Sequence, residues 1–401
     1  MKNIKFIFAI LLVCMRFASC GSKFESLKWS KELTTEVLSP EVYSSLNNEY
    51  ERVSPFICDG LVCVYKNSRY GYVDKSGKLV VSCIYSMAED FEDGCARVAK
   101  SVDSWSGEWG LIDTDGKEIV ACQYHSIDKF IDGIAIASKE IDDEYKYGFI
   151  NKKGEVIVPM NYDRVEEFSN DVALIVQNGK YGFVNEKGEE VVHCTYDFAF
   201  SFEEGSELAT CQSGENIHCV DNEGNIVLSF NINASRYNTF DNFYEGFMIV
   251  AVYSEEKEKR IYGVIDEKGN EIVPCKYDAI EYFSDGLAVV RSEDKYGCIN
   301  EKGELVIPCE IMGRIYGFTD GLSWVYEGFY YAIDKKGEVK IVLPKDMTPV
   351  TAFNDGRAIV KFRGNGTDYG FVDESGNIEI AFLGGEKDLE KMGEDMGFDV
   401  Y

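Results

Sequence analysis

The side chains of this chain that could do chemistry are few and do not converge in the sequence. The three histidines, His125, His193 and His218, have no second histidine or cysteine at the spacing of a zinc ligand set. A serine elbow, a metalloprotease helix and a phosphate-binding loop are all absent from the sequence. Carboxylates are so frequent that proximity in the sequence identifies no acid–base pair. We therefore expect a protein that is not an enzyme, with no catalytic residue, no metal and no cofactor.

The run Asp113-Thr114-Asp115-Gly116 has acids spaced as at the start of a calcium-binding loop. The same frame, with Asp or Asn first and Gly fourth, recurs nine times, and other copies read DKSG, NKKG and NEKG. Because an acid or amide at the first position caps a type I turn, and Gly takes the left-handed conformation after it, the frame predicts a β-hairpin turn in every copy. The nine anchor glycines are Gly77, Gly116, Gly154, Gly188, Gly224, Gly269, Gly303, Gly337 and Gly376.

A second glycine stands six residues before most anchors and follows Tyr or Trp, as in Tyr70-Gly71, Trp109-Gly110 and Tyr147-Gly148. Two copies have lost it and read Ile217-His218 and Tyr330-Tyr331. A glycine within a strand indicates that a ring or a neighbouring backbone packs over the bare position. We expect these aromatic rings to belong to the core.

The strand after each anchor alternates with a period of two, so positions four, six and eight share one face. Position six is cysteine in five copies and Met, Phe or Leu in the others, which indicates a hydrophobic position; the five are Cys83, Cys122, Cys194, Cys275 and Cys309. We expect buried thiols here, with a disulfide such as Cys58–Cys63 as an open alternative. Proline at position five in three copies predicts an edge strand or a bulge.

After most anchors comes F-x-D/E-G, whose glycine stands about 17 residues after the anchor and is followed by alternating apolar residues, as at Phe91–Gly94 and Phe283–Gly286. Each copy thus predicts three clear strands and a fourth short one. A unit this small cannot bury its apolar face, so neighbouring units must complete the core. We expect an all-β fold of nine tandem hairpin units in an open superhelical or solenoid array. A closed β-propeller-like arrangement is the alternative, although propellers typically have four to eight blades.

Together these positions resemble the WG-repeat family of bacterial proteins, also called KWG repeats. The shared pattern is an aromatic residue and Gly, then Asp or Asn, the turn Gly and a strand that often carries Pro, followed by F-x-x-G. It covers roughly residues 56–382, and Trp109-Gly110 is the one literal WG pair, since Tyr replaces Trp in the other copies. The resemblance implies an all-β repeat array with a binding or scaffolding role, and it carries over no catalytic residue.

The N-terminus has a different composition. Lys2 and Lys5 precede an apolar run, which is typical of a signal peptide over residues 1–19. The following FASC resembles a lipobox, in which Cys20 would be lipidated, although Phe17 and Arg16 depart from that pattern. We expect a polar tether over 20–54, the repeat array over 55–382 and an acidic C-terminal tail over 383–401. The expected location is the bacterial envelope, lipid-anchored at the outer membrane or the periplasmic face, with a soluble secreted or periplasmic form as the alternative.

The formal net charge is -29, and no basic patch is present that could neutralise phosphates. Nucleic acid is therefore not an expected partner, and contact with a membrane is expected only through the N-terminal lipid. A protein or a glycan remains as the expected partner.

The connection between the F-x-D/E-G strand and the aromatic–Gly strand varies in length, with extra residues at 101–108, 139–146, 253–260 and 363–368. Insertions at one point of a repeat emerge on one face of the array, and that face is often where repeat proteins bind. The candidate binding residues are Trp105, Trp109 and Tyr145. The predicted function is a binding or scaffold module; the alternatives are a hydrolase acting on envelope polymers and a structural spacer without a ligand.

Overall fold

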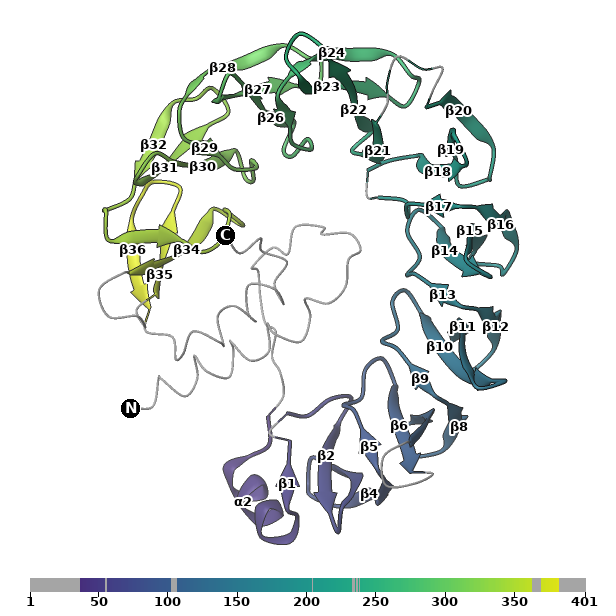
Figure 1. The fold of residues 1–401 in the computed structure, drawn as a ribbon. Helices are drawn as coiled ribbons and strands as arrows, with labels where there is room; N and C mark the ends of the chain where they lie inside the picture. The colour runs from purple at the N-terminus through teal and green to yellow at the C-terminus, as the bar shows by residue number, and fades with distance from the viewer. Residues whose placement is uncertain are drawn as a thin grey trace. The chain divides into compact units, whose positions relative to one another are not determined.

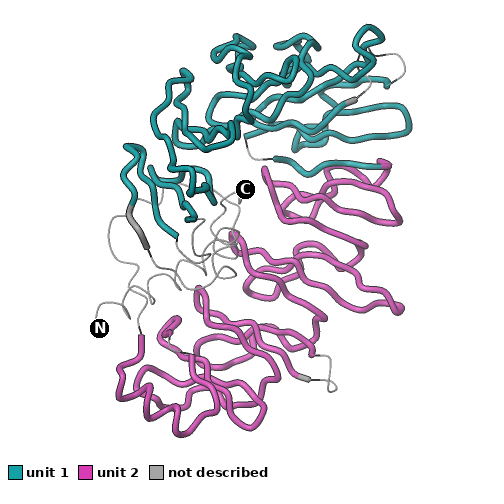
Figure 2. The backbone as a smooth tube through the Cα atoms, turned by 60° about the vertical axis from the view of Figure 1, so that its left-hand side comes forward, with its two compact units in different colours: residues 1–22, 198–401 teal, residues 23–197 magenta. Residues whose placement is uncertain are grey.

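The computed structural model describes residues 37–54, 56–101, 107–203, 205–232, 235, 237, 239–362 and 369–381. These residues form one α-helix and nine four-stranded antiparallel sheets, in which each strand pairs with its neighbours in the sequence (Figure 1). We number the sheets one to nine in chain order and call the strands of each sheet first to fourth. The chain divides into two compact units, residues 23–197 and residues 198–401 with 1–22 (Figure 2).

The unit of residues 23–197 holds α2 (Pro40–Glu49) and the first four sheets. Their strands are β1 (Arg52–Val53), β2 (Leu61–Lys66), β3 (Arg69–Asp74) and β4 (Leu79–Tyr85); β5 (Met87–Ala88), β6 (Cys95–Ser101), β7 (Gly107–Asp113) and β8 (Glu118–Tyr124); β9 (Ser126–Ile127), β10 (Ile134–Ile141), β11 (Glu144–Asn151) and β12 (Val156–Tyr162); and β13 (Arg164–Val165), β14 (Val172–Gln177), β15 (Lys180–Asn185) and β16 (Glu190–Tyr196). The fourth strands β8, β12 and β16 follow one another along one rim of this unit (Figure 1).

The other unit holds sheets five to nine. Their strands are β17 (Phe198–Ala199), β18 (Ala209–Ser213), β19 (Asn216–Val220) and β20 (Ile226–Asn231); β21 (Thr239–Tyr244), β22 (Phe247–Ser254), β23 (Lys259–Asp266) and β24 (Glu271–Tyr277); β25 (Ala279–Ile280), β26 (Leu287–Ser292), β27 (Lys295–Asn300) and β28 (Leu305–Ile311); β29 (Arg314–Ile315), β30 (Leu322–Tyr326), β31 (Tyr330–Asp334) and β32 (Val339–Val342); and β33 (Met347–Pro349), β34 (Arg357–Phe362), β35 (Tyr369–Asp373) and β36 (Ile378–Ala381). The all-β repeat class and the nine units are confirmed.

The Asp/Asn-x-x-Gly frame is the turn between the third and fourth strands of every sheet. At Asp74 the carboxylate Oδ1 accepts hydrogen bonds from the N–H groups of Ser76 (2.9 Å) and Lys78 (3.0 Å), and Gly77 has φ +88°. Asp113 does the same with the N–H groups of Asp115 (3.1 Å) and Lys117 (2.8 Å). The run that resembles a calcium loop is therefore a capped turn, as the sequence predicted.

The strand glycine lies under a bulge of the fourth strand. In sheet three, Tyr147 pairs with Tyr162 and Phe149 pairs with Val158, so one residue of β11 faces three of β12. An added Cβ at Gly148 would lie 2.3 Å from the backbone oxygen of Val158. The same bulge occurs in sheets one, two, four, six and seven, all of which carry the glycine. Proline at position five therefore falls both on an edge strand and in a bulge, as predicted.

Sheets five and eight, which carry His218 and Tyr331 in place of that glycine, lack this bulge. His218 pairs directly with Ser229, and Ala332 follows Tyr331 in regular register with Ile341. Glycine at this position permits the bulge but does not by itself produce it, because Gly370 of sheet nine pairs in regular register with Ile380.

The cysteines of position six are half-buried, where the sequence predicted buried thiols, and each packs against a hydrophobic cluster. The sulfur of Cys122 lies 3.8 Å from the backbone oxygen of Val98, the residue that pairs with Gly110. In sheet six, an added Cβ on Gly263 would lie 3.0 Å from the sulfur of Cys275. A small, polarisable side chain thus covers the bare glycine at a sheet rim, which explains why the cysteines occur only in bulged sheets. All eleven cysteines of the described residues are thiols.

Most hydrophobic clusters of the described residues are shared by two consecutive sheets, and one joins α2 to sheet one. Tyr72 and Val81 of sheet one pack with Phe91 and Ile112 of sheet two. In sheets eight and nine, Trp324 stacks on Phe353 with ring centroids 4.9 Å apart. One sheet therefore does not enclose a core by itself, as the repeat pattern predicted.

The first sheet begins before the expected boundary at residue 55, because β1 (Arg52–Val53) pairs with β2. Ser39 caps α2 by accepting a hydrogen bond from the N–H of Val42 (3.3 Å), and Leu46 and Tyr50 pack against sheet one. Residues 37–54, expected in the tether, are thus part of a packed unit. Among the described residues, no helix is long and apolar enough to cross a membrane. Residues 1–36, with the predicted signal peptide and Cys20, and the predicted tail lie outside the described residues.

Candidate functional site

The variable connection of the repeat is the hairpin between the second and third strands. In sheet three the extra residues lengthen the strands: β10 and β11 pair continuously from Ile134–Asn151 to Ile141–Glu144 around a tight turn at 142–143. The second and third strands of sheet four are two residues shorter, with a pairing that ends at Gln177–Lys180. The insertion at 139–146 therefore makes a protruding hairpin.

Tyr145 lies near the tip of this hairpin and is 45% exposed. Its ring packs on the imidazole of His125, with centroids 4.0 Å apart and planes inclined by 30°. His125 directly precedes β9, and its N–H donates to the backbone oxygen of Ser138 (2.8 Å). The imidazole thus holds an exposed phenol ring in place above the sheet.

A surface hollow of about 550 Å³ lies beside this ring. Its lining comes from the hairpin of sheet three and from two positions of sheet four: Asp143, Glu144, Tyr145, Lys146, Tyr147, Asp163 and Asn178. All of these residues belong to the unit of residues 23–197, so the hollow lies within one compact unit.

The floor of the hollow is an ordered polar network. The ammonium of Lys146 contacts carboxylate oxygens of Glu144 and Asp163, each at 2.6 Å. The second carboxylate oxygen of Asp163 accepts the N–H of Asn178 (2.7 Å). The hydrogen bond from Lys146 holds the pKa of Asp163 below its usual value, and Asp163 in turn raises the pKa of Lys146. Both groups are therefore charged at neutral pH.

The arrangement around Asp163 recurs at other junctions between sheets. Asp278 contacts the ammonium of Lys259 (2.8 Å) and accepts the N–H of Glu293 (2.9 Å), and Asp197 contacts Lys180 (2.5 Å). Asp163 and Asp278 therefore tie the hairpin of one sheet to the hairpin of the next.

Sequence reasoning missed these acids, although a signal was present: each directly follows the tyrosine at position eight, as in Tyr162-Asp163, Tyr196-Asp197 and Tyr277-Asp278. Between sheets two and three His125 follows Tyr124 at this position, so the ring pair with Tyr145 stands where the junctions after sheets three, four and six have an acid.

The other two predicted binding residues have different positions. Trp109, on β7, is half-buried, pairs with Tyr124 and packs at the edge of the core between sheets two and three. Trp105 lies outside the described residues. The structure therefore places Tyr145 at the hollow and gives Trp109 a packing role.

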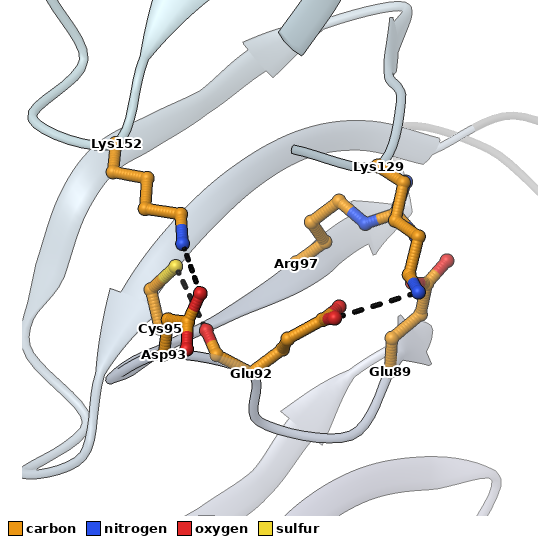
Figure 3. A network of polar contacts seen from close by, with 7 residues as sticks. All are labelled: Glu89, Glu92, Asp93, Cys95, Arg97, Lys129 and Lys152. Carbon is orange, nitrogen blue, oxygen red and sulfur yellow. Dashed lines mark hydrogen bonds and ion pairs between the residues drawn. The ribbon is translucent and has the colours of Figure 1, made fainter. Parts of the chain in front are cut away.

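A second polar network joins sheets two and three (Figure 3). Lys152 contacts Asp93 (2.8 Å), Lys129 contacts Glu92 (3.4 Å), and Arg97 contacts Glu89. The Arg97 guanidinium also donates to the backbone oxygen of Ile127 (2.9 Å). Burial raises the pKa of the Cys95 thiol beside them, so it is protonated at neutral pH. Since each cation in Figure 3 contacts an anion, this network holds the two sheets together.

Of the three histidines, His193 is exposed and contacts Glu190 (2.8 Å), and His218 lies on β19. Within the described part of the chain, no group of three or more His, Cys, Asp or Glu side chains has the arrangement of a metal site.

Comparison with solved structures finds distant similarity. A eukaryotic initiation factor is 9% identical and has a TM-score of 0.39, over 79% of this chain and 82% of that chain. Hsv2p of Kluyveromyces lactis is 8% identical with a TM-score of 0.33, over 65% and 97%. The tricorn protease is 13% identical with a TM-score of 0.25, over 81% and 38%. No curated protein matches the sequence.

The family of WG-containing repeats matches six segments: residues 70–101, 109–140, 147–181, 181–210, 262–296 and 296–328. The first runs from β3 to β6 and so takes the last two strands of one sheet and the first two of the next. Each segment contains one glycine that lies under a bulge, from Gly71 to Gly297. The chain belongs to the family of proteins with WG-containing repeats.

Proposed function

We propose that this protein is a non-enzymatic binding or scaffold module, and that it holds a protein or glycan partner at the protruding hairpin of sheet three. The observation that carries the proposal is Tyr145, an exposed ring packed on His125 at the side of a hollow. An apolar ring kept in water by a rigid support is typical of a contact residue, because covering it on binding costs little conformational entropy.

The test compares partners recovered from native envelope extracts by the wild-type chain, by Tyr145→Ala and by Tyr253→Ala. Tyr253 is the matched control: it is 51% exposed and lies on β22, in the lengthened hairpin of sheet six. We expect Tyr145→Ala to lose the partner at unchanged thermal stability, and Tyr253→Ala to keep it. Equal recovery by all three would contradict the proposal and favour a structural spacer.

We further propose that the chain is exported and lipid-anchored in the bacterial envelope through Cys20. The proposal rests on Lys2 and Lys5, the apolar run that follows them and the FASC sequence. Labelling with a palmitate analogue in the native host should mark the wild-type chain and not Cys20→Ala. Equal labelling of both would exclude lipidation at this residue.

A further inference from the structure

We propose that the hollow beside Tyr145 binds a lysine or arginine side chain from an extended basic segment of a partner protein. This inference rests on the proposed binding function and names the chemistry of the partner. It combines three features of one site: a hollow, an exposed aromatic ring at its side and an excess of negative charge around it.

The charges of the lining favour a cation. Asp143, Glu144 and Asp163 contribute three carboxylates, and Lys146 is the one cation in the lining. Lys146 already contacts both Glu144 and Asp163, so its charge is compensated within the protein. An entering ammonium or guanidinium group would therefore meet a net negative site, whereas an anionic glycan would be repelled.

The aromatic ring suits the same ligand. Cations of this protein already lie over tyrosine rings: the Lys139 ammonium is 4.6 Å from the centroid of Tyr124, and the Arg314 guanidinium carbon is 4.9 Å from that of Tyr316. The quadrupole of a phenol ring attracts a cation over its face, more strongly when water is partly excluded. Tyr145 offers this contact to a cation from outside, because it is exposed and held by His125.

Lys146 provides the sharpest test, because it acts as an internal competitor. Replacing it with methionine removes the cation that compensates Glu144 and Asp163, so a basic peptide should bind more tightly. Damage to the fold would lower the affinity instead.

The experiment measures, by calorimetry, the binding of four probes to the full chain. Three are pentapeptides of different charge, penta-arginine, penta-serine and penta-glutamate, and the fourth is the neutral glycan chitopentaose. We expect penta-arginine to bind and the other three probes not to bind. Tyr145→Ala should weaken the affinity for penta-arginine at least about tenfold. Glu144→Gln should weaken it at least about threefold. Lys146→Met should strengthen the binding of penta-arginine about threefold or more.

The matched controls are Glu186→Gln and Lys187→Met, which make the same charge changes in the exposed turn of sheet four. They should leave the affinity within about twofold, since long-range charge is screened by salt. Equal effects of site and control variants would show non-specific attraction to an acidic protein and would overturn the inference. Chitopentaose binding that depends on Tyr145, without penta-arginine binding, would also overturn it but leave the proposed binding function standing. Partner recovery that does not depend on Tyr145 would remove the proposed function itself.

Discussion

Gly148 and Val158 approach so closely that a methyl group on Gly148 would lie 2.3 Å from the backbone oxygen of Val158. The contact arises because the fourth strand bulges across the third, and Pro159, which cannot donate to a ladder, lies in the bulge. Five further sheets repeat this approach. The glycine of the family pattern is thus required by backbone geometry rather than by a ligand.

Gly148→Ala should destabilise the protein by about 1–3 kcal/mol, because the backbone of β12 has to move. The free energy of unfolding from urea titration measures this. His218→Ala is the control, since β19 pairs in regular register with β20 around His218, and it should cost less than about 1 kcal/mol. If Gly148→Ala were as mild as His218→Ala, the bulge would not explain the glycine.

Asp113→Ala should cost about 1 kcal/mol, because the N–H groups of Asp115 and Lys117 lose their acceptor. Asp113→Asn should be close to neutral, since sister turns use Asn151 and Asn185 with the same bonds. Thermal unfolding with and without calcium completes the test. A calcium-dependent rise in Tm for the wild type, absent in Asp113→Asn, would contradict the capped turn.

Burial raises the pKa of Cys194 to about 11, so its thiolate is scarce at neutral pH. Maleimide should therefore modify Cys194 much more slowly in the native protein than in the unfolded chain. Cys194→Val should leave the fold intact, and Cys194→Asp should destabilise it by about 1–3 kcal/mol through a poorly solvated charge. Native labelling as fast as in urea would show that the sulfur is accessible.

Asp278 should make stability depend on pH. Burial acts to raise its pKa, but Lys259 and the N–H of Glu293 outweigh burial and hold the pKa below its usual value. A lowered folded-state pKa adds stability that is present above the unfolded pKa of about 3.9 and is lost as the pH falls through the folded pKa.

Asp278→Asn should therefore destabilise the protein at pH 7, by about 2 kcal/mol, and the difference from wild type should shrink below about pH 4. Asp197→Asn is the matched control, because its side chain is 49% exposed and also contacts a lysine; it should cost less than about 1 kcal/mol. Urea unfolding at several pH values measures both. A difference that does not change with pH would mean that the charge of Asp278 contributes nothing.

The sequence alone determined the local structure of this protein. The turn at Asp74–Gly77 depends on one acceptor and one left-handed glycine within four residues, so it could be read without knowing the fold. The bulge opposite Gly148 was also indicated, since glycine in one strand and proline in the next both mark an irregular pair. The sharing of cores between sheets followed from the small size of the repeat.

The tertiary structure decided which residues meet between sheets. Asp163 contacts Lys146 from the preceding hairpin and Asn178 from the following one, and the sequence does not show how far each hairpin extends. Tyr145 was a predicted binding residue, but its support by His125 required the pairing of β10 with β11 and the place of His125 before β9. Period and turn chemistry act over a few residues, whereas these contacts depend on strand length and on the packing of consecutive sheets, which only the folded chain sets.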